Sequence, residues 1–192
     1  MTPLDWQSCT PISSQSEYEV FDRVMREYHA KAGRDLSIIE IGSYRGQSTV
    51  LLAQYGFVFA VDLWGDIHDG VAHTDTIGKE NLLPFIETMV RFDLIGKRVF
   101  PIVSTSRVLG FLPILRADVA YVDASHYYEP AKTDIEQCVR HLSQDGLLVC
   151  HDYKRPGDSP LIGVNRAVDE LIESSEWKIK EHYNGIVFLQ RN

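Results

Sequence analysis

The sequence predicts an α/β fold in which a mostly parallel, seven-stranded sheet carries helices on both faces and ends in an antiparallel hairpin. Short apolar runs rich in β-branched residues alternate with segments whose apolar residues recur at helical spacing, as in parallel sheets. A glycine-rich turn separates the first strand from its helix. Asn184-Gly185, near the end of the chain, is a dipeptide typical of two-residue hairpin turns.

The first expected elements are a helix over 15–31 and a strand over 37–41. Apolar side chains of the helix segment fall on one face, and Ser14 or Ser16 is placed to cap its start. Gly33 is placed to end it. The run Ser-Ile-Ile-Glu-Ile that follows is long enough for one buried strand.

The next units repeat this alternation. The glycine turn leads into a helix over 48–55, and an apolar strand follows at 57–62. Residues 63–78 are polar and glycine-bearing, which predicts a loop that can fold over a ligand. A helix over 79–92 and a strand over 99–103 come next.

The second half contains two more strands and then the hairpin. A strand at 117–123 precedes a helix over 130–142, with Pro130 in its first turn. Asp145-Gly146 predicts a turn before the strand at 147–150. The last expected elements are a helix over 163–173 and hairpin strands at 177–183 and 186–191.

Length and charge limit the organisation and the partners. A chain of 192 residues with 44% hydrophobic content suits one core, so we expect a single domain over 1–192, with a lead-in and helix over 1–36 and the core over 37–192. A formal net charge of −8 argues against nucleic acid as a partner, because phosphate binding needs clustered Lys and Arg.

Cysteine use and hydropathy indicate the compartment. Cys9, Cys138 and Cys150 form an odd set without metal-site spacing, which predicts reduced thiols. No signal-like start and no apolar stretch long enough for a membrane span is found in the sequence, which predicts no membrane association. The expected location is the cytoplasm.

The turn from Gly42 to Gly46 is the candidate cofactor loop. Its pattern, Glu40-x-Gly42-x-x-x-Gly46, differs from the dinucleotide motif Gly-x-Gly-x-x-Gly and lacks the Lys-Ser/Thr ending of a P-loop. Glycines let the backbone approach a ligand closely, and free N–H groups at a helix start suit a polar or anionic group. The alternative is an ordinary strand-to-helix turn.

Two further positions at strand ends suit a nucleotide-like cofactor. Asp62 ends the second strand, where a carboxylate can accept hydrogen bonds from ribose hydroxyls, and it lies one βαβ step beyond Gly42. Ser104, after the third strand, is either part of a helix cap or a contact to the cofactor base.

These motifs resemble those of class I S-adenosylmethionine (SAM)-dependent methyltransferases, whose Rossmann-like fold ends in an antiparallel hairpin. The resemblance rests on residues 40–48, on Asp62 and on the hairpin, and it covers about residues 37 to 190. Residues 123–129 and 151–153 resemble the small-molecule O-methyltransferase group that includes macrocin and mycinamicin sugar methyltransferases. The implied activity is O-methylation of a small hydroxylated molecule.

The resemblance implies roles for individual residues. Gly42, Ser43 and Gly46 would lie along the methionine part of SAM, Glu40 would support the loop, and Asp62 would hold the ribose. In metal-using relatives, acids after the fourth and fifth strands bind Mg²⁺ and a nearby His acts as base. The matching residues are Asp123, Asp152 and His126, whereas His151 stands where some relatives have a further acid.

The assigned roles of Asp123, Asp152 and His126 suit the chemistry of methyl transfer to a hydroxyl, and each residue also has a structural alternative. A divalent cation on Asp123 and Asp152 would lower the pKa of an acceptor hydroxyl, and His126 would take its proton. The alternatives are that Asp123 caps a loop, that Asp152 pairs with Lys154 or Arg155, and that His126 is structural. His151 is expected to orient a carboxylate.

Two competing functions remain at this stage. A nicotinamide-dependent oxidoreductase would also use the first βαβ unit and Asp62, although the dinucleotide motif is missing. A non-catalytic SAM-binding domain would need the acids only for loop structure. The sequence leaves the acceptor and the oligomeric state open, homo-oligomers included.

Overall fold

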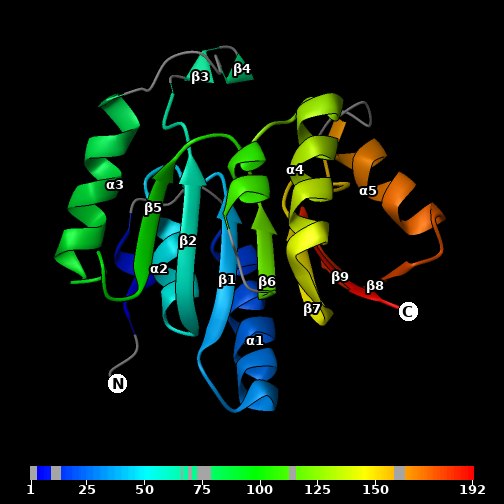
Figure 1. Ribbon diagram of the computed structural model, residues 1–192, viewed down its shortest axis with the longest axis horizontal. Helices are drawn as coiled ribbons and strands as arrows, with labels where there is room; N and C mark the ends of the chain where they lie inside the picture. The colour runs from blue at the N-terminus through cyan, green and yellow to red at the C-terminus, as the bar shows by residue number, and fades with distance from the viewer. Residues whose placement is uncertain are drawn as a thin grey trace.

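The seven-stranded sheet forms the centre of the molecule in a computed structural model that describes residues 4–9, 14–65, 67–68, 71–72, 79–112, 116–157 and 163–192. Its strand order is β5-β2-β1-β6-β7-β9-β8 (Figure 1). The first five of these pair in parallel, whereas β9 runs antiparallel to both β7 and β8. The predicted fold class is confirmed, including the hairpin that closes the sheet.

The elements follow the predicted alternation. The helices are α1 (Gln15–Ala32), α2 (Gln47–Ala53), α3 (Lys79–Arg91), α4 (Tyr128–His141) and α5 (Gly163–Glu173), with short 3₁₀ turns η1 (Trp6–Ser8) and η2 (Ser106–Phe111). The sheet strands are β1 (Leu36–Ile41), β2 (Gly56–Asp62), β5 (Val99–Val103), β6 (Ala117–Val122), β7 (Leu142–Cys150), β8 (Trp177–Tyr183) and β9 (Ile186–Arg191).

Helices cover both faces of the sheet. Apolar residues of α1, α2 and α3 form one buried cluster with alternate residues of the strands. Residues of η2, α4 and α5 form a second cluster with the side chains on the opposite face. Because successive strand residues point to opposite faces, the apolar residues of β1 and β6 contribute to both clusters.

Helix α1 is held at both ends by the residues that the sequence indicates. Ser14 and Glu17 form a reciprocal capping box, which settles Ser14 rather than Ser16 as the cap. Gly33 ends the helix in the left-handed conformation, with φ 66°. Glu17 is nevertheless buried, at 3% exposure, which a simple capping residue does not require.

The structure differs from the prediction at the start of β7. The expected turn at Asp145-Gly146 is wrong, because the strand runs from Leu142 to Cys150. Leu142 leaves α4 in an extended conformation (φ −73°, ψ 141°) and pairs at once with Ala117. The register then shifts between Ala117 and Val119, so the extra residues form an irregularity within the strand.

The expected loop over 63–78 contains a small antiparallel ribbon. Strands β3 (Ile67–His68) and β4 (Val71–Ala72) pair with each other and lie beyond the C-terminal end of β2 (Figure 1). Residues 66, 69–70 and 73–78 lie outside the described part of the chain. The ribbon stands at the edge of the sheet where parallel strands place ligands.

Two expectations about the environment of the chain can be compared with the structure. The three cysteines are free and buried in the structure. Among the described residues, no helix combines the length and apolar character needed to cross a membrane.

Candidate functional site

A cavity of about 490 Å³ opens at the carboxyl ends of β1, β2, β5 and β6. Its walls come from the glycine turn, from the residues after each of these strands and from the first turns of α4. The polar residues that line it are Tyr44, Asp62, Trp64, Ser104, Thr105, Ser106, Arg107, Asp123, Ser125, Glu129, Thr133 and Asp134. Its size is within the range of roughly 300–1,000 Å³ that small-molecule sites occupy.

Gly42 joins the glycine turn to the neighbouring strand β6. Its φ of +87° is in the left-handed region, and a Cβ at this position would lie 2.0 Å from the backbone oxygen of Asp123. Gly46 has a φ of +89°, and there a Cβ would lie 2.5 Å from Met89 Cε of helix α3. Gly42 is therefore needed for contact with β6, and Gly46 for contact with α3.

Glu40 supports the turn from below. It is fully buried in β1, and its Oε2 accepts hydrogen bonds from Ser43 Oγ (2.8 Å) and Thr49 Oγ1 (2.6 Å). Burial raises the pKa of Glu40 to about 7, although the hydroxyl donors around it act in the opposite direction. The carboxyl group thus fixes the turn onto α2 without lining the cavity.

Asp62 binds the outer side of the same turn. Its Oδ2 accepts hydrogen bonds from the backbone N–H groups of Ser43 and Tyr44, both at 2.8 Å. Its Oδ1 accepts the N–H of Trp64 at 2.6 Å. Burial raises the pKa of Asp62, and these backbone donors limit the rise. Asp62 therefore shapes the cavity wall while part of its carboxylate faces the cavity.

Two buried polar side chains, Ser106 and Asp134, lie at the β5 end of the cavity. Ser106 is 2% exposed, and its hydroxyl faces the carboxyl of Asp134. Asp134 of α4 is 8% exposed, and burial raises its pKa to about 6 while nearby Ser106 lowers it. Both residues line the cavity, so this end offers polar groups that a ligand can bind.

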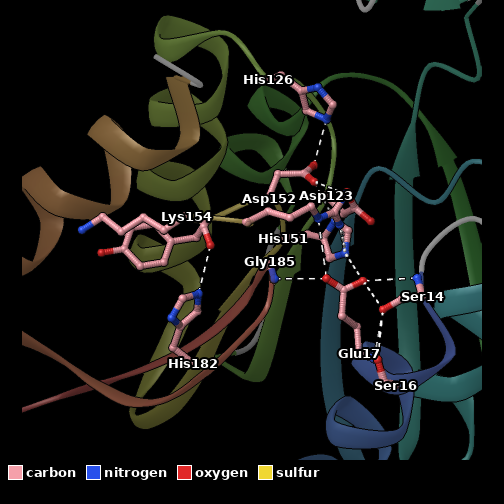
Figure 2. A network of polar contacts seen from close by, with 12 residues as sticks. Ser14, Ser16, Glu17, Asp123, His126, His151, Asp152, Lys154, His182 and Gly185 are labelled. Atoms are coloured by element: carbon pink, nitrogen blue, oxygen red, sulfur yellow. Dashed lines mark hydrogen bonds and ion pairs between the residues drawn. The ribbon is translucent and has the colours of Figure 1, made fainter. Parts of the chain in front are cut away.

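A corner of acids and histidines adjoins the cavity at Asp123. His126 Nε2 lies 2.8 Å from Asp152 Oδ2, and His151 Nδ1 lies 3.2 Å from Asp123 Oδ1 and 3.3 Å from Asp152 Oδ1. Tyr121, fully buried in β6, donates to Asp123 Oδ2 at 2.8 Å. Figure 2 shows His126, Asp152, Asp123 and His151 converging at this corner.

The ionisable side chains at this corner shift one another's pKa values. The hydrogen bond to Asp152 is the main cause of a raised pKa at His126. Burial raises the pKa of Asp152, but the hydrogen bonds from His126 and His151 outweigh it and hold the carboxyl well below its usual range. Asp152 is therefore ionised at neutral pH, and His126 is a stronger base than a free histidine.

Two opposing effects act on the pKa of His151. Burial opposes its charged form, whereas the carboxylates of Asp123 and Asp152 outweigh burial and raise its pKa. Arg155 Nη2 lies 3.0 Å from His151 Nε2, and a guanidinium can only donate a hydrogen bond. The raised pKa favours a ring protonated on both nitrogens, whereas the contact with Arg155 favours a ring whose Nε2 carries no proton; in both states the proton on Nδ1 faces the two carboxylates.

A family model of the methyltransferase domain matches residues 39–153, which contain the glycine turn, Asp62, Asp123 and Asp152. The chain belongs to the methyltransferase domain family. No curated protein sequence matches it significantly.

Solved structures share the fold of this methyltransferase at low sequence identity. An O-methyltransferase from Bacillus cereus in complex with SAH is 13% identical with a TM-score of 0.70, over 95% of this chain and 84% of that chain. TomG from Streptomyces achromogenes, in complex with SAM, is 14% identical with a TM-score of 0.68, over 94% and 81%. The O-methyltransferase NovP is 17% identical with a TM-score of 0.68, over 90% and 78%.

The predicted site residues of the methyltransferase fall into groups with different positions. Those that line the cavity are Gly42, Asp62, Ser104 and Asp123. Glu40 lies behind the turn, Ser43 and Gly46 belong to it, and all three hold its shape without lining the cavity. His126 and Asp152 are absent from the cavity wall but are joined to Asp123 through His151.

Several residues of the site were not predicted from the sequence. Tyr44 and Trp64 adopt positive φ (44° and 50°) to form the cavity wall, and Trp64 Nε1 donates to Tyr44 O at 2.8 Å. Asp134 is placed on the buried face of its helix, and a charged residue on an apolar helix face is a signal that could have found it. No local pattern marks Tyr121.

Proposed function

We propose that this methyltransferase transfers the methyl group of SAM to a hydroxyl group of a small molecule, and that residues 1–192 form one domain. The observation that carries the proposal is the meeting of the glycine turn, Asp62 and Asp123 around one cavity, with the His126–Asp152 pair beside it. Solved proteins of this fold include O-methyltransferases in complex with SAM or SAH.

The cavity fits a cofactor of this kind. Gly42 brings the backbone to its floor, the Asp62 carboxylate offers acceptors for ribose hydroxyls, and Leu63 gives an apolar wall. The buried hydroxyl of Ser106 and the carboxyl of Asp134, together with Ser104, supply polar groups for a base.

His126 is the residue that we assign to proton removal. When bound, SAM supplies a methyl group on a positively charged sulfur, and transfer to a hydroxyl oxygen releases the hydroxyl proton. Asp152 accepts a hydrogen bond at His126 Nε2, which leaves Nδ1 able to receive that proton. The His126 side chain is 53% exposed, so an acceptor can reach it.

A magnesium ion on Asp123 and Asp152 fits this site poorly. Ligand atoms of Asp123, His151 and Asp152 all lie within 4.8 Å of one another, which is close enough for a metal. However, Mg²⁺ prefers oxygen ligands, and an imidazole nitrogen is one of the three donors. His151, Arg155 and His126 also already contact these carboxylates, so we derive no step through a metal.

The acceptor is expected to be a small hydroxylated molecule rather than a nucleic acid. The net charge of −8 opposes phosphate-backbone binding, and the group that the motifs resemble methylates sugars. The loops expected to select the acceptor cover 63–78 and 153–163; Leu63, Trp64 and Gly65 line the cavity, and residues 66, 69–70, 73–78 and 158–162 lie outside the described chain. Part of the surface expected to select the acceptor falls there.

Calorimetry with SAH and NAD tests the cofactor assignment. We expect SAH to bind and NAD to give no heat. The matched variant Asp62→Asn should weaken SAH by about tenfold or more, because it replaces the charged acceptor of ribose hydrogen bonds. Binding of NAD without SAH would favour the oxidoreductase alternative.

Radiolabelled methyl transfer tests the activity. Incubation with labelled SAM and a panel of sugars and phenols should label at least one acceptor, and His126→Ala should abolish that labelling while SAH affinity stays unchanged. Equal labelling by wild type and His126→Ala would remove the assigned base. SAH binding with no labelling across a broad panel would favour a non-catalytic binding domain.

A further inference from the structure

Arg155 lies at the centre of the acid–histidine corner. It follows β7 in a segment where Asp152 and Lys154 take positive φ of 59° and 46°. Its Nη1 lies 3.2 Å from Asp152 Oδ1, and its Nη2 lies 3.0 Å from His151 Nε2. The side chain is 30% exposed, so the guanidinium is largely enclosed by the groups that it contacts.

Glu17 holds Arg155 from the opposite side. Glu17 Oε1 lies 3.6 Å from Arg155 Nε and accepts the backbone N–H of Gly185 at 3.0 Å. Its Oε2 caps α1 through Ser14. Figure 2 shows Glu17 reaching from the start of α1 toward His151 and the turn of the hairpin at Gly185. Helix α1 therefore places a buried carboxylate beside the cation of the corner, at ion-pair distance.

Every carboxylate oxygen of the corner already faces a protein donor. Asp123 Oδ2 accepts from Tyr121, and Asp123 Oδ1 faces His151. Asp152 Oδ2 faces His126, and Asp152 Oδ1 faces both Arg155 and His151. A divalent cation at Asp123 and Asp152 would have to displace these donors and lie next to a fixed guanidinium, which it repels.

We propose that Arg155 is the resident cation of this corner and that the enzyme works without a divalent metal. Arg155 balances the charge of Asp152 and keeps the Asp152 carboxylate in one orientation. Glu17 lies on the other side of the same guanidinium. Asp152 then presents Oδ2 to His126 and fixes the ring that takes the acceptor proton. Arg155 is thus a positioning residue, and the inference deepens the proposed function on which it rests.

Removal of the Arg155 guanidinium should turn the corner into a metal-binding site. In Arg155→Met, Asp152 and Glu17 lose their fixed cation, while Asp123, His151 and Asp152 keep ligand atoms within 4.8 Å of one another. Two carboxylates and an imidazole suit a first-row transition metal such as Mn²⁺. The variant should therefore gain a Mn²⁺ site that the wild type lacks.

Mn²⁺ binding, followed by electron paramagnetic resonance, tests this without any acceptor. We expect Mn²⁺ to stay free with wild type and with the control Arg166→Met, whose arginine lies on the exposed side of α5. Arg155→Met should bind Mn²⁺ at least about tenfold more tightly, the effect of removing one close like charge. Arg155→Lys, which keeps a cation, should resemble the wild type.

Methyl transfer with an acceptor from the panel gives the second readout. After treatment with EDTA, wild-type kcat should stay within about twofold of the untreated rate, and added Mg²⁺ or Mn²⁺ should not raise it. Loss of activity in EDTA with recovery on adding metal would overturn the proposal, as would tight Mn²⁺ binding to the wild type. Absence of SAH binding would instead contradict the proposed function. The two failures can be told apart, because the Mn²⁺ measurement requires neither SAH nor methyl transfer.

Discussion

The glycine turn and the acid–histidine corner lie side by side but are built in opposite ways. The turn consists of consecutive residues, and backbone N–H groups of Ser43 and Tyr44 hold it on Asp62. The corner consists of side chains from α1, β6, the segment after β6 and the segment after β7. A site made of backbone is fixed by local sequence, whereas a site made of converging side chains depends on the whole fold.

This difference predicts that variants in the two regions separate binding from turnover. Changes in the turn should lower cofactor affinity and stability together, because the same atoms serve both. Changes in the corner should lower the rate and leave cofactor affinity unchanged, since the corner residues His126 and Asp152 are not part of the cavity wall.

The largest effect is expected for Asp152→Asn in the corner. Loss of the carboxylate that orients His126 should lower kcat by about 10²–10⁴-fold, the usual contribution of a positioned base, with SAH affinity unchanged. Because the hydrogen bond to Asp152 raises the pKa of His126, its loss lowers that pKa. The acidic limb of the pH–rate profile should therefore move to lower pH.

A control for Asp152→Asn is Asp93→Asn, whose carboxylate is 79% exposed and pairs with nearby Lys97. It should leave the rate and the pH profile unchanged. An Asp152→Asn enzyme with the wild-type pH profile would show that His126 is not the group that must lose a proton.

Gly42→Ala should give the next largest effect. It should lower the stability of the protein and its affinity for SAH together. The new Cβ would lie 2.0 Å from a backbone oxygen at a φ of +87°, so β1 and β6 must separate or the turn must rearrange. We expect a loss of about 3 kcal/mol or more in unfolding free energy, measured by urea denaturation, together with weaker SAH binding.

Comparison of Gly96→Ala with Gly42→Ala separates the cost of a steric clash from the cost of a positive φ in a residue other than glycine. Gly96 also has a positive φ, of +69°, but among the described residues, its two chain neighbours aside, no atom lies within 4 Å of the position of its Cβ. This variant should lose only about 1–2 kcal/mol, the cost of a left-handed residue other than glycine. Equal losses in both variants would mean that the contact of Gly42 with β6 is unimportant.

Glu40→Gln should give a smaller effect, visible in the pH dependence of stability. Folding raises the pKa of this carboxyl from its ordinary value to about 7, so its contribution to stability is complete below pH 4.5 and is lost as pH rises through 7. From pH 5 to pH 8 the wild type should lose about 2–3 kcal/mol relative to Glu40→Gln. Parallel stability curves would contradict a buried carboxyl of raised pKa.

The contrast between the regions also explains what the sequence could predict. The alternation of β-branched and helical segments predicted all seven sheet strands, since periodicity is a local property. The turn at Gly42, the strand-end acid Asp62 and the hairpin at Asn184-Gly185 follow from adjacent residues. The turn expected at Asp145-Gly146 failed because pairing of Leu142 with Ala117 outweighed the local signal.

The corner was predicted only in outline. The resemblance placed Asp123 and Asp152 after the fourth and fifth strands, and a pairing of Asp152 with Arg155 was one of the alternatives that the sequence left open. That Glu17 reaches this corner from the N-terminal helix could not be predicted, because no short-range pattern links α1 to the segment after β7. The burial of Asp134 beside Ser106 likewise depends on how α4 packs on η2.

The most direct measurement is a crystal structure of the protein with SAH. The account predicts that SAH lies in the cavity with its ribose hydroxyls on Asp62, its homocysteine over Gly42 and its sulfur directed toward Asp123 and His126. SAH bound elsewhere, or bound with its sulfur directed away from the corner, would contradict the account.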